Sequence, residues 1–168
     1  GPLCDAVLAR SDSTAALRRI ADANMLISRV GDRDPVYRCH ALLREILETE
    51  LHELQPQEES ALHLRASRFY GDTGDRDRAA THAIASGDFD YAANLIWEMT
   101  PEFETRGRAE TLRRWLACFD EGQLERSAPL CLTLATIATG NGDGSSVERW
   151  VAAARAAYEG RWRDMAPA

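Results

Sequence analysis

The chain has 168 residues, of which 45% are hydrophobic and 28% charged, a composition that excludes a disordered chain and is typical of an ordinary soluble protein. The formal net charge is −7, and this acidic balance argues against a free-standing nucleic-acid-binding protein, because phosphate neutralisation needs clustered basic side chains. No apolar run approaches the roughly 20 residues of a membrane-spanning helix, and no signal-peptide pattern opens the chain, so we expect a cytoplasmic location.

The four cysteines are far apart in the sequence and form no Cys-x-x-Cys pair; they are Cys4, Cys39, Cys118 and Cys131. We therefore expect reduced, buried thiols. Gly1-Pro2 is typical of the residues that remain when an expression tag is removed by a protease. We expect the chain to be a piece excised from a longer protein.

The first 40 residues predict two helices and a hairpin. Residues 3–10 predict a short helix, and Asp12 or Ser13 can cap a second one. The common stripe of this second helix consists of Leu17, Ile20, Ala21 and Asn24. Residues 25–30 and 36–39 are β-like runs around a loop with Gly31 and Pro35, which predicts a β-hairpin. With the helix that follows, this order predicts the second half of a winged helix. Because residues 12–24 carry only two arginines, we expect an internal coupling domain rather than a DNA-reading one.

The stretch from Val36 to Leu54 is the segment around which we expect the chain to be organised. It begins extended and becomes a helix at or just after His40. One apolar face at helical spacing consists of Leu43, Ile46, Leu47, Leu51 and Leu54. The residues predicted to face water are Arg44, Glu45, Glu48 and His52. A histidine at a strand-to-helix corner lies beside the free N–H groups of the first helical turn, a position that favours an anion.

Beyond Pro56, which predicts the start of a further helix, Gly-Asp pairs punctuate the chain; they are Gly74-Asp75, Gly87-Asp88 and Gly142-Asp143. Glycine ends one helix, aspartate caps the next, and the paired alanines that follow the first two let helices approach closely. The pattern predicts antiparallel helical hairpins that are TPR-like but irregular in period. Helices are expected near residues 56–70, 91–99, 109–119, 129–138 and 145–158.

The predicted fold class is therefore mainly α, with three parts. Residues 1–54 form the C-terminal part of a winged-helix domain, residues 55–160 a helical-repeat arm, and residues 161–168 a frayed C-terminal stub. Six aromatic residues fall in or at the start of the predicted helices of the arm: Phe69, Phe89, Tyr91, Trp97, Trp115 and Trp150. We expect most of them to be core, Trp115 and its neighbour Leu116 above all, although such arrays also use aromatics to line a concave binding face.

The run Tyr37-Arg38-Cys39-His40-Ala41-Leu42-Leu43-Arg44-Glu45 resembles the end of the winged helix in large LuxR-type STAND ATPase transcription regulators, the MalT-like group. Three further matches extend the resemblance over roughly residues 3–158: Leu62-His63-x-Arg65-Ala66, Ala79-x-x-His82-Ala83-x-Ala85-x-Gly87-Asp88 and Trp115-Leu116. In that family the corner histidine approaches the β-phosphate of ADP, which implies that His40 contacts ADP in the full-length protein. Ala41 stands where related proteins often carry aspartate. The family's phosphate-binding Gly-Lys-Ser/Thr loop and DNA-binding helix-turn-helix are missing from these residues.

The resemblance implies an internal regulatory fragment that couples the nucleotide state of a missing nucleotide-binding domain in cis to an inducer or protein partner sensed by the helical arm. The resemblance implies that the fragment itself binds no cofactor and that the full-length protein binds ATP or ADP. It also implies no direct nucleic-acid or membrane partner, and it leaves self-association open. A stand-alone helical-repeat adaptor for protein interaction is the alternative. No enzyme motif is present, so we expect no catalytic residue. We also expect no metal, because His52, His63 and His82 lack ligand spacing, and we expect Glu58-Glu59 and Glu102-x-Glu104 to be solvated helix ends.

Overall fold

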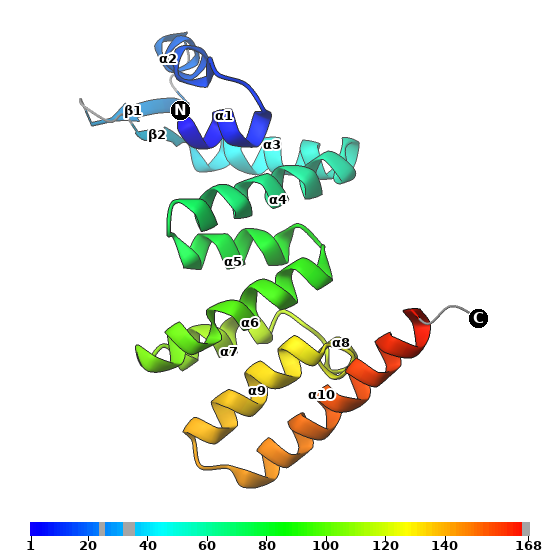
Figure 1. The fold of residues 1–168 in the computed structure, drawn as a ribbon. Coiled ribbons are helices and arrows are strands. Elements are labelled where there is room, and N and C mark those ends of the chain that lie inside the picture. Colours follow the sequence, from blue (N-terminus) through cyan, green and yellow to red (C-terminus); the bar gives the residue numbers. More distant parts are fainter. Residues whose placement is uncertain (24–25, 32–35, 166–168) are drawn as a thin grey trace. The chain divides into compact units, whose positions relative to one another are not determined.

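The computed structural model describes residues 1–23, 26–31 and 36–165 (Figure 1). In this part of the chain, ten helices accompany a single two-stranded antiparallel sheet, which confirms a mainly α fold with a small β-hairpin. The chain forms two compact units, residues 1–75 and residues 76–168. This division follows spatial contacts, and the predicted domain boundaries after residues 54 and 160 stay predictions.

The first unit holds the hairpin and four helices. Their order is α1 (Pro2–Leu8), α2 (Ser13–Ala23), β1 (Ile27–Val30), β2 (Val36–Cys39), α3 (Ala41–Leu54) and α4 (Pro56–Asp72). Ile27 lies opposite Cys39 and Val30 opposite Val36, so the predicted hairpin is confirmed. The start of the first predicted strand at Met25, Asn24 of the predicted stripe, and loop residues 32–35 lie outside the described residues.

An acidic side chain of α1 accepts a hydrogen bond from the start of α2, a contact that the sequence did not indicate. The backbone N–H of Ser13 donates a 2.9 Å hydrogen bond to Oδ1 of Asp5 in α1. This bond from Ser13 lowers the pKa of the Asp5 carboxyl, because it favours the charged form. The side chain of Asp12, one of the two predicted caps, instead pairs with Arg10, whose Nη2 lies 2.7 Å from the carboxylate. The Asp5 carboxylate therefore links α1 to the first residue of α2 by a hydrogen bond.

Helix α3 is far less buried than its apolar periodicity suggested. None of its residues is buried, and of the five predicted apolar-face residues only Leu43 and Leu51 are half-buried. Ile46, Leu47 and Leu54 remain 54%, 50% and 69% exposed. Helix α4 is the neighbour that α3 contacts most within this unit, so packing covers one side of α3 only. The hypothesis that the chain is organised around this segment is wrong as a statement about packing.

The second unit is a helical array. It consists of α5 (Arg76–Ala85), α6 (Phe89–Thr105), α7 (Ala109–Leu116), α8 (Glu121–Glu125), α9 (Ala128–Gly140) and α10 (Gly144–Met165). Helix α6 packs on α5 and α9, and α9 packs along α10 (Figure 1). Helices α6, α9 and α10 run past their predicted ends at Met99, Ala138 and Tyr158, whereas α7 ends at Leu116 and not at residue 119. Residues 161–165 of the predicted frayed stub are therefore helical. The last three residues, 166–168, lie outside the described chain.

The turns of the second unit follow the Gly-Asp pattern. Gly87 and Gly142 have φ angles of 73° and 72°, a left-handed backbone that glycine adopts without a Cβ penalty. Asp88 accepts a 3.0 Å hydrogen bond from the N–H of Tyr91, and Asp143 accepts one of 3.1 Å from the N–H of Ser146. The alanines after the first two pairs are at most 1% exposed; they are Ala79, Ala80, Ala92 and Ala93. The predicted pattern, in which glycine ends one helix and aspartate caps the next, is therefore confirmed at these two turns.

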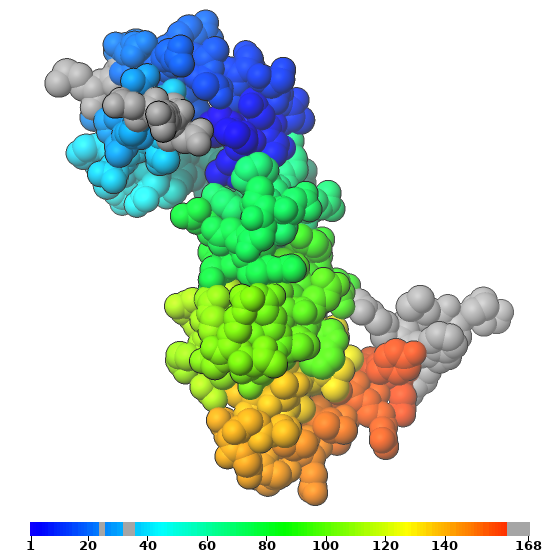
Figure 2. Space-filling view, turned by 60° about the vertical axis from the view of Figure 1, so that its left-hand side comes forward, coloured from blue at the N-terminus to red at the C-terminus, as the bar shows by residue number. Residues whose placement is uncertain are grey.

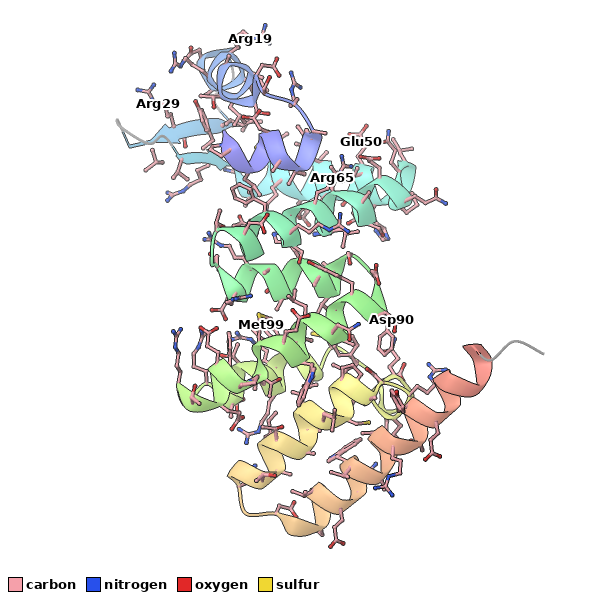
Figure 3. All side chains as sticks on the ribbon, viewed as in Figure 1. Arg19, Arg29, Glu50, Arg65, Asp90 and Met99 are labelled. Carbon is pink, nitrogen blue, oxygen red and sulfur yellow. The ribbon has the colours of Figure 1, made fainter. Side chains whose placement is uncertain are left out.

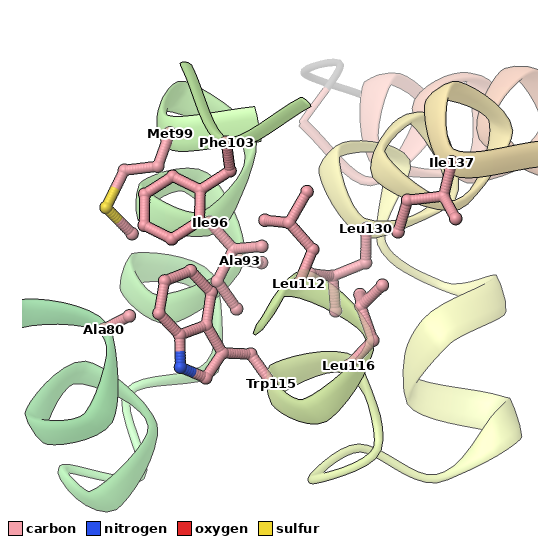
Figure 4. Close-up of a cluster of buried hydrophobic side chains, with 10 residues drawn as sticks. All are labelled: Ala80, Ala93, Ile96, Met99, Phe103, Leu112, Trp115, Leu116, Leu130 and Ile137. Atoms are coloured by element: carbon pink, nitrogen blue, oxygen red, sulfur yellow. The ribbon is translucent and has the colours of Figure 1, made fainter. Parts of the chain in front are cut away.

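A cluster of buried apolar side chains holds the second unit together (Figure 4). It consists of Ala80, Ala93, Ile96, Met99, Phe103, Leu112, Trp115, Leu116, Leu130 and Ile137. Trp115 and Leu116 are 3% and 4% exposed, which confirms both as core residues. The other five aromatic residues that we expected mostly in the core are half-buried, and of these Phe89 packs against the cluster, so the expectation holds fully for Trp115 and in part for Phe89. The described core therefore joins α5, α6, α7 and α9.

Candidate functional site

His40 occupies the predicted strand-to-helix corner, directly after β2 and directly before α3. Its backbone is extended, with φ −60° and ψ 139°, which is the usual conformation of a helix N-cap residue. The His40 N–H donates a 2.7 Å hydrogen bond to the carbonyl of Leu26, and its carbonyl accepts one of 3.0 Å from the N–H of Arg44. The backbone of the hairpin and the first turn of α3 therefore hold the corner residue from both sides.

The His40 ring caps the helix that follows it. Its Nδ1 accepts a hydrogen bond from the N–H of Leu42, and the two nitrogens are 3.3 Å apart, near the long limit for such a bond. A ring nitrogen that accepts carries no proton, so in the neutral ring the proton sits on Nε2. The side chain is exposed, and Nε2 has no hydrogen-bond partner among the described residues. The ring thus caps with one nitrogen and offers a donor with the other.

Two backbone donors lie beside the ring. The N–H groups of Ala41 and Leu43, in the first turn of α3, have no acceptor within the described segments. The unpaired N–H groups of a first turn carry the partial positive charge of the helix dipole. Together with Nε2 of His40 they make three donors at one exposed corner. Because Nδ1 faces the first turn, Nε2–H points away from these two N–H groups, so an anion at this exposed corner would meet either the ring donor or the backbone donors.

Several of the other candidate side chains have structural partners, but Oε1 of Glu104 is buried without a hydrogen-bond partner among the described residues, so the expectation of a solvated helix end is wrong for Glu104. Nδ1 of His52 lies 2.8 Å from Oε2 of Glu59, which links α3 to α4. Glu58 pairs with Arg65 at 2.7 Å, and Glu102 pairs with Arg106 at 2.6 Å. Across the described side chains of residues 1–23, 26–31 and 36–160, no three His, Cys, Asp or Glu side chains converge where a metal ion could bind. Among the helices of the described chain, none combines the length and the apolar character that crossing a bilayer requires.

The cysteines differ in environment. Only Cys131 is buried, and its thiol donates to the carbonyl of Leu124 at 3.1 Å. Burial raises the pKa of the Cys131 thiol, because an apolar surrounding disfavours the thiolate. Cys4 and Cys39 are half-buried and Cys118 is exposed, so the expectation of buried thiols is wrong for these three. All four thiols are free.

Comparison with known proteins gives one match. Residues 1–59 match the family model described as the MalT winged helix domain, which covers 59 of the 168 residues. The matched range includes α1, α2, both strands, the His40 corner and α3. No curated protein and no solved structure gives a match. The helical array of the second unit lies outside the matched range, so the comparison supports a MalT-like winged helix in residues 1–59.

Proposed function

We propose that residues 1–168 are an internal coupling segment of a LuxR-type STAND ATPase transcription regulator of the MalT-like group, acting in the cytoplasm. The observation that carries the proposal is the match to the MalT winged helix domain over the residues that form the His40 corner. In this role the winged helix responds to the nucleotide held by a separate domain of the same polypeptide. The helical array that follows the winged helix in the sequence binds an inducer or a protein partner. The segment couples that binding to the nucleotide state.

The corner contributes to this role through hydrogen bonding to a phosphate. Nε2–H of His40 would donate to a phosphate oxygen of ADP while Nδ1 keeps its bond to the Leu42 N–H. A hydrogen bond to a charged group contributes about 1.5–3 kcal/mol. If the contact forms only in the resting state, it favours that state about tenfold to a hundredfold. The nucleotide itself belongs to a domain outside these residues, and the segment carries out no reaction of its own.

Binding measurements on two proteins test the proposal. By isothermal titration calorimetry, the 168-residue chain is expected to bind neither ATP, ADP nor a DNA duplex at physiological salt, because its corner is open and its net charge is −7. A longer polypeptide that contains the chain is expected to purify with bound ADP. Micromolar nucleotide binding by the chain alone, or a longer polypeptide that never binds nucleotide, would contradict the proposed role.

A second candidate function, a helical-repeat adaptor, rests on a cavity of about 310 Å³ in the second unit. Trp97 of α6, Leu132 of α9 and Tyr158 of α10 contribute apolar surface to its lining. An adaptor could hold one apolar side chain of a peptide there, without any nucleotide. Peptide binding by the 168-residue chain and by the longer polypeptide separates the two candidates. An adaptor would keep its affinity for the peptide in the 168-residue chain, where no nucleotide-binding domain is present.

A further inference from the structure

One face of α3 is apolar, acidic and uncovered. We call this face the outer face of α3, and a shallow groove runs along it. It consists of the apolar residues Leu42, Ile46 and Leu54 and the acidic residues Glu45, Glu50 and Glu53. The three apolar side chains are 60%, 54% and 69% exposed. The atoms of α3, cyan in the space-filling view, form part of the molecular surface (Figure 2). From Leu42 to Leu54 the face extends over about 18 Å, or three helical turns.

The spacing of these residues places two of them close together. At about 100° per residue, Ile46 lies about 40° and Leu54 about 120° around the helix from Leu42, so Leu42 and Ile46 form the apolar stripe and Leu54 lies at its edge. Thr49 lies between Ile46 and Leu54 in the sequence, and its hydroxyl already donates a 2.8 Å hydrogen bond to the carbonyl of Glu45. The polar group of Thr49 is therefore satisfied within α3, which leaves the surface beside the stripe suitable for apolar contact.

The three acids of the outer face are not neutralised within the described residues. Around the helix, Glu45 and Glu50 lie on the two sides of the stripe, and Glu53 lies between Leu42 and Ile46. Helix α3 carries two basic side chains, and each has an acidic partner elsewhere: Arg44 lies 3.7 Å from Glu48, and His52 lies 2.8 Å from Glu59. Glu45, Glu50 and Glu53 have no ion-pair partner in the described part of the chain; Glu50 is labelled among the side chains of α3 in Figure 3. The outer face therefore combines exposed apolar surface with three uncompensated negative charges.

We propose that the outer face of α3 docks a separate protein through a basic amphipathic helix of that partner. A partner helix with apolar residues three or four positions apart would contact Leu42 and Ile46. Arg or Lys next to those apolar residues would meet the carboxylates of Glu45, Glu50 and Glu53. Exposed apolar patches rimmed by polar residues mark interaction sites on soluble proteins. Pairing with a second copy through the same face would place acid against acid, so charge disfavours that occupant. The docking does not require a nucleotide, and it stands independently of the proposed coupling role.

Fluorescence anisotropy with the 168-residue chain tests the docking. The probe is a fluorescein-labelled helical peptide of Ala and Leu, with Arg on both sides of its Leu stripe. A second peptide of the same design carries Glu in place of each Arg. The Arg peptide is expected to bind with a Kd of about 1–100 μM at low salt, with binding much weakened at about 1 M salt, and the Glu peptide is expected not to bind.

Variants of exposed residues locate the binding surface without disturbing the fold. Ile46→Ser removes one of the two apolar residues of the stripe and is expected to weaken the Arg peptide about tenfold or more. The triple change Glu45→Gln, Glu50→Gln and Glu53→Gln is expected to weaken it about tenfold, and only at low salt. The matched controls are Val151→Ser, at a residue 42% exposed on α10, and the triple change Glu98→Gln, Glu148→Gln and Glu159→Gln at exposed residues of α6 and α10. Both controls are expected to leave the affinity unchanged.

Three results would overturn the proposal. Absence of binding by the wild-type chain would exclude a basic helix as the occupant. Equal weakening by the two triple changes would mean that the peptide responds to net charge and not to α3. A wild-type dimer in sedimentation velocity that Ile46→Ser converts to a monomer would assign the outer face to a second copy of the chain.

Discussion

Trp115→Ala tests the packing of the helical array most severely. Trp115 is 3% exposed, and its ring centroid lies 5.0 Å from that of Phe103. Truncation removes the indole from a cluster contributed by α5, α6, α7 and α9, and the surrounding helices can close the cavity only in part. Replacing a buried Trp by Ala costs about 3–5 kcal/mol, so the loss is a large fraction of the stability of a unit of this size.

Thermal unfolding followed by far-UV circular dichroism measures the Trp115 effect. In a unit of this size, 1 kcal/mol shifts Tm by about 4–8 °C, so the variant should melt more than about 10 °C below the wild type. Trp97→Ala is the matched control, because Trp97 is half-buried, and it should shift Tm by less. If Trp115→Ala melts within about 2 °C of the wild type, the cluster does not hold the second unit together as described.

Three further substitutions probe local features. Gly87→Ala should destabilise by about 1–2 kcal/mol in denaturant unfolding, because φ is 73° and no atom obstructs a new Cβ, so the backbone alone carries the cost. Asp143→Asn should lower Tm at neutral pH, because the hydroxyl of Ser146 donates a hydrogen bond to the Asp143 carboxylate and holds the pKa of that carboxyl below the ordinary 3.8. The difference in Tm between the variant and the wild type should therefore shrink as pH falls below 3.8. In the isolated chain, His40→Ala should cost about 0.5–1 kcal/mol in chemical denaturation, since a 3.3 Å cap bond is lost, whereas His40→Asn keeps a capping acceptor and should cost less.

Local backbone chemistry was the part of the fold that could be predicted best from the sequence. The hairpin and the turns at Gly87 and Gly142 depend on glycine conformation and on aspartate caps, which act within a few residues. The five-residue α8 was missed because it is too short to show periodicity, although Asp120 and Gln123 form a capping box there. Helix α6 continues through Pro101, since burial of Met99 and Phe103 on either side outweighs the local stop signal.

The burial of α3 could not be predicted from its sequence. A 3.6-residue period identifies an apolar face, but it does not tell whether another element of the same chain covers that face. Ile46 and Leu54 have the period of core residues and remain exposed. The sequence pattern likewise predicted the position of His40 at the corner but not the contacts of its ring. The hydrogen bond that Nδ1 accepts from the Leu42 N–H depends on the orientation of the ring, which the sequence does not specify.

The most direct test of the coupling role is the rate of ADP release from the longer regulator that contains this chain, measured for wild type, His40→Ala and His40→Asn. Asn preserves a helix-capping acceptor but lacks the imidazole Nε2–H, so it separates capping from phosphate contact. If His40 donates to a phosphate in the resting state, both variants should release ADP about tenfold to a hundredfold faster and raise target transcription without inducer. If the folded His40→Asn protein retains ADP like the wild type and stays silent, His40 is a helix cap alone and the phosphate contact is contradicted.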